Sequence, residues 1–155
     1  MERNWNKDWR RSIIVMSGGF DPVHKGHLRM FREASWLGHQ VIVGLNSDDG
    51  LIRKKEKPFM KFDERKEILE AFRYVNQVIP FNDDDGSACD LIEKVNDMYD
   101  TDQKIYFANG GDRGKDNVPE VDTCKDLGVI MLWGVGGGKI QSSSWLIGEK
   151  ENERI

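Results

Sequence analysis

Short apolar runs alternate along the chain with segments in which apolar side chains recur every three or four residues. An apolar run of four to eight residues, bounded by turn residues, is typical of a strand buried in a parallel sheet. On this criterion the sequence predicts strands at residues 13–16, 41–45, 77–80, 104–108 and 129–133.

Helical spacing of apolar residues recurs in three segments between these predicted strands. Ser87 is the expected N-cap of the third helix, with Asp90 in its first turn, and Asp63 is the expected N-cap of the second. The three apolar stripes are Leu28, Phe31, Ala34 and Leu37; Phe62, Ile68, Leu69 and Phe72; and Ala88, Leu91, Ile92, Val95 and Met98.

Alternation of strands and helices predicts parallel βαβ units with right-handed connections. A chain of 155 residues is long enough for one sheet covered by helices on both faces. We therefore expect an α/β fold with a doubly wound, five-stranded parallel sheet. A polar arm at residues 1–11 precedes the single domain, which we expect at residues 12–150.

Polar and glycine-rich segments follow four of the predicted strands, at residues 18–27, 46–49, 109–113 and 136–139. In doubly wound sheets, ligands bind beyond the carboxyl ends of the strands. These segments are therefore expected to converge on one edge of the sheet and to form the functional site there.

Charge and composition exclude several classes of protein. The formal net charge is −4 with 32% charged residues, which argues against a general nucleic-acid coat protein. Positive charge is concentrated in a predicted basic loop at residues 52–58, which suits a small anionic substrate. No apolar stretch approaches the roughly 20 residues that cross a bilayer. Cys89 and Cys124 lack a metal-binding spacing, and free thiols in a cytoplasmic protein are expected.

The segment at residues 18–27 carries the clearest chemistry, since it joins a predicted buried strand to an amphipathic helix. A helix N-terminus after a glycine-containing turn is a site for phosphate, because its first N–H groups are unpaired. His24 and His27 face this region, and Gly26 lets the backbone approach an anion closely. A glycine pair alone is often only a turn, but paired histidines in this register favour polyphosphate binding and charge stabilisation.

His-x-Gly-His preceded by Gly-x-Phe-Asp-Pro resembles the nucleotidyltransferase superfamily, which includes cytidylyltransferases and small adenylyltransferases. The resemblance extends from about residue 13 to residue 147 and implies the Rossmann-like nucleotidyltransferase fold. It implies that His24 and His27 stabilise the transition state at the α-phosphate. The same motif implies nucleotide binding by Gly18, Gly19, Phe20, Asp21 and Gly26.

Further segments resemble glycerol-3-phosphate and ethanolamine-phosphate cytidylyltransferases and the adenylyltransferase domain of heptose-phosphate enzymes. Lys55 and Arg65 match phosphate-contacting positions, with Lys57 a second candidate; Arg65 could instead form an ion pair on a helix face. Asp48 of Asn46-Ser47-Asp48 could contact hydroxyls of the acceptor or serve only as a turn-former. The remaining resemblance implies nucleotide binding by Gly111 and Asp112 and phosphate binding by Ser142, Ser143 and Ser144.

Two departures leave the choice of base open. Residues 113–117 replace an aromatic-containing sequence, and Gly136-Gly137-Gly138-Lys139 replaces the Arg-Thr-x-Gly stretch of cytidylyltransferases. Lys139 is a candidate for the missing charge.

The resemblance implies transfer of a nucleotidyl group from a nucleoside triphosphate, with CTP favoured, to a phosphorylated polyol, sugar or aminoalcohol. Mg²⁺ is expected on the triphosphate as cofactor, and a homodimer is usual in these families. Transfer from ATP and a non-catalytic nucleotide-binding module are the alternatives. Neither nucleic acid nor a membrane is an expected partner.

Overall fold

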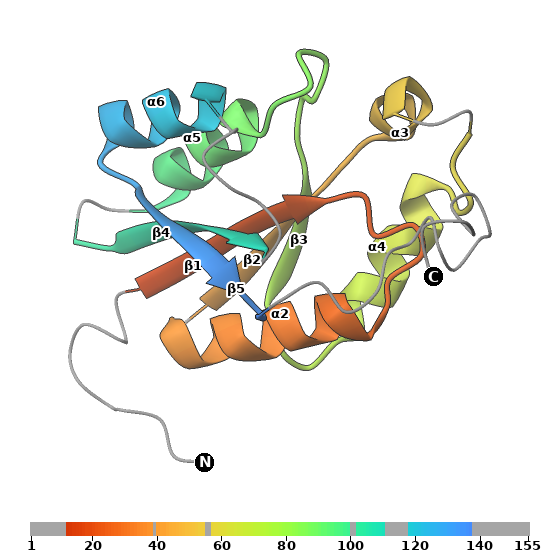
Figure 1. Ribbon diagram of the computed structural model, residues 1–155, viewed down its shortest axis with the longest axis horizontal. Helices are drawn as coiled ribbons and strands as arrows, with labels where there is room; N and C mark the ends of the chain where they lie inside the picture. Colours follow the sequence, from red (N-terminus) through yellow and green to blue (C-terminus); the bar gives the residue numbers. More distant parts are fainter. Residues whose placement is uncertain (1–11, 39, 55–56, 100–101, 111–117, 138–155) are drawn as a thin grey trace.

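The computed structural model describes residues 12–38, 40–54, 57–99, 102–110 and 118–137 (Figure 1). Its centre is a parallel sheet of five strands in the order β3-β2-β1-β4-β5. The strands are β1 (Ser12–Gly18), β2 (Gln40–Leu45), β3 (Gln77–Pro80), β4 (Lys104–Gly110) and β5 (Ile130–Val135). The predicted doubly wound α/β fold is therefore confirmed.

Helices cover both faces of this sheet. Figure 1 shows α5 and α6 on one face and α2 and α4 on the other. The helices are α2 (Lys25–Leu37), α3 (Asp48–Lys54), α4 (Phe62–Glu70), α5 (Cys89–Met98) and α6 (Val118–Leu127). No helix among the described residues is long and apolar enough to span a membrane.

Strand β1 separates two apolar cores, because successive side chains of a strand point to opposite faces. Ile14 and Met16 pack with Phe31 of α2 and Leu69 of α4. Ile13 and Val15 pack on the opposite face with Leu91 of α5 and Cys124 of α6. A strand covered on both faces must be apolar throughout, which explains the continuous apolar run that predicted it.

Strand order reverses at β1. The chain runs from β1 outward to β2 and β3, then crosses to β4 and β5 on the other side. Adjacent strand ends whose connections diverge in this way leave a crevice for ligands at the carboxyl edge. The β1–α2 turn with its two histidines lies at this point.

The predicted strand at residues 77–80 is confirmed with the same bounds, and the others differ by a few residues. Strand β1 continues past its apolar run because Ser17 and Gly18 still pair with Gly44 and Leu45 of β2. Val129 is not part of β5: its N–H donates to Cys124 O of α6 at 2.8 Å.

Three local predictions were wrong. Asp63 is not an N-cap, because α4 begins at Phe62 and its N-cap is Lys61. The N-cap of α5 is Ala88 rather than Ser87, although Ser87 Oγ still accepts the Cys89 N–H at 3.2 Å. The predicted loop at residues 52–58 is helical up to Lys54, the last residue of α3.

Candidate functional site

His24 and His27 form a stacked pair at the beginning of α2. Their ring centroids are 3.8 Å apart at an interplanar angle of 23°. His24 is the N-cap residue, and its Nδ1 accepts the N–H of Gly26 at 3.1 Å. The N–H of His24 donates in turn to His27 Nδ1 at 3.1 Å, which completes a capping box. Gly26 thus lies inside the first turn of α2, where its amide is held by the first histidine.

These hydrogen bonds define which nitrogen of each imidazole carries hydrogen. Because Nδ1 of both rings accepts an N–H, the neutral rings must carry their hydrogen on Nε2. Burial and the neighbouring His24 lower the pKa of His27 to about 3. His27 is therefore a neutral donor near pH 7, and its Nε2–H has no hydrogen-bond partner among the described residues.

The Phe20 ring packs against the ring of His27. The backbone of Phe20 is in the left-handed region with φ of 50°, which is unfavourable for a bulky residue. The ring is buried and lies 4.8 Å from the His27 ring and 5.5 Å from the Phe31 ring, centroid to centroid. A Cβ at Gly18 would come within 2.9 Å of the Phe20 ring, so a glycine there makes room for it. Packing in this turn thus fixes the orientation of His27.

Asp21 points into the protein, with only 2% of its surface exposed. Its two carboxylate oxygens accept the N–H groups of Phe59 and Met60, both at 2.6 Å. Asp21 was predicted to bind the nucleotide. In the structure its carboxylate holds Phe59 and Met60, which follow the basic residues, against the β1–α2 turn.

Arg65 lies fully buried at the junction of several loops, with a side-chain exposure of 0%. Its Nε donates to Met60 O at 3.0 Å, and Nη1 donates to Gly19 O at 3.0 Å and to Asn46 O at 2.8 Å. Its Nη2 forms an ion pair with Asp48 Oδ1 at 2.8 Å. Of the two predicted roles, the geometry favours the ion pair, because a guanidinium without exposed surface does not face a phosphate.

Asp48 is the first residue of α3 and its side chain is 38% exposed. Because Arg65 binds one oxygen, the carboxylate is held in place while part of it faces solvent. The structure thus brings together the β1–α2 turn, the beginning of α3 and Arg65 of α4.

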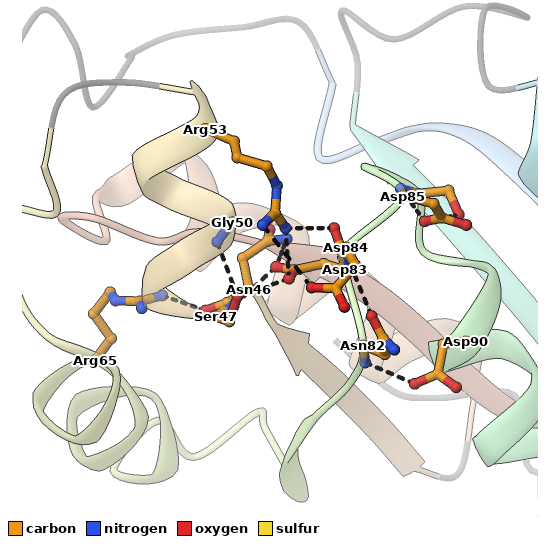
Figure 2. A network of polar contacts seen from close by, with 11 residues as sticks. Asn46, Ser47, Gly50, Arg53, Arg65, Asn82, Asp83, Asp84, Asp85 and Asp90 are labelled. Atoms are coloured by element: carbon orange, nitrogen blue, oxygen red, sulfur yellow. Dashed lines mark hydrogen bonds and ion pairs between the residues drawn. The ribbon is translucent and has the colours of Figure 1, made fainter.

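Sequence reasoning missed Asp83, which lies after β3 and is 3% exposed. Figure 2 shows it at the centre of a polar network. Oδ2 accepts Asn46 Nδ2 and the Ser47 N–H, both at 2.9 Å, and Oδ1 accepts Ser47 Oγ at 2.7 Å. Arg53 Nη2 donates to the backbone O of Asp83 at 2.7 Å and to Oδ1 at 3.1 Å. The run Asp83-Asp84-Asp85 after a predicted strand was the available signal.

The charge state of Asp83 follows from this network. Burial by itself raises the pKa of this carboxyl, but hydrogen bonds from Asn46 and Ser47 and the Arg53 charge outweigh it and lower the pKa. Asp83 is therefore ionised near neutral pH, and it forms an ion pair with the guanidinium of Arg53.

Several predicted residues lie outside the described part of the chain: Lys55, Gly111, Asp112, Ser142, Ser143 and Ser144. Their roles stay predictions. The second candidate of the basic segment, Lys57, is described and its side chain is exposed. Within the described ranges, no three His, Cys, Asp or Glu side chains gather as a potential metal site.

Comparison with known proteins shows the family and the fold of the chain. A family model described as Cytidylyltransferase-like matches residues 15–129. Glycerol-3-phosphate cytidylyltransferase of Bacillus subtilis (strain 168) is 31% identical over 86 residues, 56% of this chain and 67% of that protein. The bifunctional protein HldE of Coxiella burnetii is 33% identical over 75 residues, 47% of this chain but only 16% of that protein.

Among solved structures, the lipopolysaccharide core biosynthesis protein from Thermoplasma volcanium superposes with a TM-score of 0.66. The match covers 82% of this chain and 98% of that one, at 17% identity. At this identity the likeness shows a shared fold.

Proposed function

The chain belongs to the cytidylyltransferase-like family, and from this premise we propose that it transfers a nucleoside monophosphate from a nucleoside triphosphate to a phosphorylated small molecule. One observation carries the proposal: the stacked pair of His24 and His27 at the beginning of α2, with both Nδ1 atoms occupied. Two Nε2–H groups are thereby fixed as donors, beside a helix N-terminus that favours anions.

The reaction needs no covalent intermediate on the enzyme. A phosphate oxygen of the acceptor attacks the α-phosphorus in line, and the bond between this phosphorus and the bridging oxygen of the β-phosphate breaks. Pyrophosphate leaves with the electron pair of that bond. Negative charge grows on the α-phosphoryl oxygens, where donors that are already oriented stabilise the transition state more than the substrate.

Asp48 is the proposed ligand of the acceptor. Its carboxylate is fixed by Arg65 on one oxygen and partly exposed, so it can accept a hydrogen bond from a hydroxyl group. The exposed Lys57, together with Lys55, would neutralise the repulsion between an acceptor phosphate and the triphosphate. We infer a polyol phosphate as the first acceptor to test, since a relative that is matched over 67% of its length is named for glycerol 3-phosphate.

The other proposed ligands follow the family motif. Gly18, Gly19, Phe20, Asp21 and Gly26 would shape the nucleotide side of the site. Gly111 and Asp112 would lie near base or ribose, and Ser142, Ser143 and Ser144 would hold the leaving pyrophosphate. Mg²⁺ would arrive on the triphosphate and be bound mainly by phosphate oxygens and water.

CTP is the favoured donor, and ATP is the alternative, which the resemblance of Asn46-Ser47-Asp48 to the adenylyltransferase domain of heptose-phosphate enzymes supports. The test is pyrophosphate release with Mg²⁺ and either CTP or ATP, against glycerol 3-phosphate, phosphoethanolamine and heptose 1-phosphate. Release that requires one triphosphate and one acceptor supports the proposal. Measurable nucleotide binding without release for any pair contradicts it and favours a binding module.

We also propose a homodimer, for which sedimentation equilibrium should give twice the chain mass of 17.9 kDa.

A further inference from the structure

Helix α3 holds the proposed acceptor ligand but is too short to be stable alone. It spans Asp48–Lys54, whereas isolated helices shorter than about 12 residues are marginal in water. Its position must therefore come from contacts with other elements. Those contacts include an ion pair near each end of the helix, in which one partner is buried.

Each end of α3 forms an ion pair with a different neighbour. At the first residue, Asp48 binds the buried Arg65 of α4. At the other end, Arg53 binds Asp83, which follows β3. Exposure distinguishes the two ion pairs of Arg53: Asp83 is 3% exposed, whereas Asp84, 3.9 Å away, is 81% exposed. The Arg53 side chain is itself 42% exposed. Its contact with Asp83 is nevertheless the one expected to fix the helix, because the carboxylate is buried and Arg53 Nη2 also donates to the backbone O of Asp83.

Asp83 also organises the residue directly before α3. Its carboxylate accepts both the N–H and the Oγ–H of Ser47, and Ser47 Oγ in turn accepts the N–H of Gly50 at 2.9 Å. A Cβ at Gly50 would lie 2.1 Å from Asp83 Oδ2, so only glycine lets the carboxylate approach this turn. The contacts of Asp83 thus reach Ser47 and Gly50, which lie on either side of Asp48.

The same helix contacts the β1–α2 turn. A Cβ at Gly19 would lie 2.7 Å from Leu51 Cδ2, which shows how closely α3 packs on the segment that leads to the histidines. A displacement of α3 would therefore move Asp48 relative to the α-phosphate site.

We propose that Asp83 is a positioning residue for the acceptor: it holds α3 through Ser47 and Arg53 so that Asp48 faces the hydroxyl groups of the acceptor. The inference rests on the proposed transferase function. It assigns Asp83 no contact with either substrate.

Steady-state kinetics of Asp83→Asn with the active triphosphate and glycerol 3-phosphate, or the acceptor found above, test the inference. We expect the KM for the acceptor to rise, so that kcat/KM for the acceptor falls roughly 10- to 100-fold, as for a displacement of about 1 Å at a reacting group. KM for the triphosphate should change less than about twofold, because the β1–α2 turn keeps its own contacts. Asp84→Asn is the matched control and should leave both constants unchanged.

Ser47→Ala is a milder second variant in case Asp83→Asn fails to fold. It removes the hydrogen bonds of Ser47 Oγ but keeps the hydrogen bond from the Ser47 N–H to Asp83. Like Asp83→Asn, it should raise the KM for the acceptor. A loss of kcat with both KM values unchanged would show a merely structural role and overturn the inference.

Asp48→Ala separates this inference from the proposed function. If Asp48→Ala raises the acceptor KM and neither Asp83→Asn nor Ser47→Ala does, only the inference about Asp83 fails. If the wild-type protein shows no transferase activity, or Asp48→Ala leaves the acceptor KM unchanged, the proposed function or its acceptor site fails first.

Discussion

His27 is a hydrogen-bond donor rather than a cation at neutral pH. Burial and the adjacent His24 lower its pKa to about 3, and its Nδ1 is occupied by the His24 N–H. The side chain can therefore stabilise charge on a phosphoryl oxygen only through Nε2–H. This arrangement is oriented before substrate arrives, so no reorganisation accompanies the reaction.

His27→Ala should reduce kcat by about 10²- to 10³-fold, the usual cost of removing one oriented donor. The lost capping contact should lower the unfolding free energy by only about 1 kcal/mol. Pyrophosphate release and thermal unfolding of the same preparation measure the two effects. Turnover close to wild type in a folded variant would contradict the role of His27.

His27 should also make the folded state sensitive to acid. Its pKa is about 3 when folded and 6.5 otherwise, so the unfolded chain takes up the proton first as pH falls. The stabilisation is complete above pH 6.5 and is lost between that pH and about 3, by up to about 1.4 kcal/mol per pH unit. His27→Gln keeps an acceptor for the capping box but does not titrate, so its unfolding free energy in urea should depend less on pH. Equal pH slopes for the two proteins would refute this account.

At the scale of elements, Arg65 joins α4 to the β1–α2 turn, to the end of β2 and to α3. Its hydrogen bonds to Gly19 O, Asn46 O and Asp48 Oδ1 connect segments that are distant in sequence. Because the guanidinium is fully buried, its removal would deprive Gly19 O and Asn46 O of this donor inside the protein.

Arg65→Met should lower the unfolding free energy by about 3–5 kcal/mol, the range for removing one partner of a buried ion pair. Lys66→Met is the matched control on the same helix. Its ion pair with Glu70 is exposed, so its loss should change stability by less than about 0.5 kcal/mol. Chemical denaturation of both variants gives the comparison. An unchanged stability with a raised KM for the triphosphate would instead show that Arg65 binds phosphate.

Elements with a strong apolar pattern could be predicted from the sequence, and the element governed by polar contacts could not. Strands β1 and β2 are buried on both faces, so their apolar runs identify them. Helix α3 has no comparable stripe. Its ends depend on Arg65 and Asp83, which come later in the chain, and no local pattern in residues 48–54 reveals these partners.

At the scale of the whole molecule, the sheet order explains which parts of the site could be predicted. Parallel strands bring their carboxyl ends to one edge, so His24, Asp48 and Asp83 converge although they follow different strands. Residue type and spacing identified the histidines. They could not show that Asp21 and Arg65 point inward, because burial depends on packing between β1, β2 and α4.

Local stability should decrease from the centre of this sheet to the edge formed by β5. Strand β1 pairs on both sides and its residues 12–16 are at most 3% exposed. Among the described residues strand β5 pairs only with β4, its register shifts near Ala108, and Ile130 and Trp133 are 47% and 38% exposed. Amides of β1 should therefore exchange only on global unfolding, while those of β5 exchange through smaller openings. Native-state hydrogen exchange in increasing denaturant measures both. If β5 exchanged as slowly as β1 and with the same denaturant dependence, the sheet would open as one cooperative unit, and the β5 side of the proposed site would be as rigid as the histidine turn.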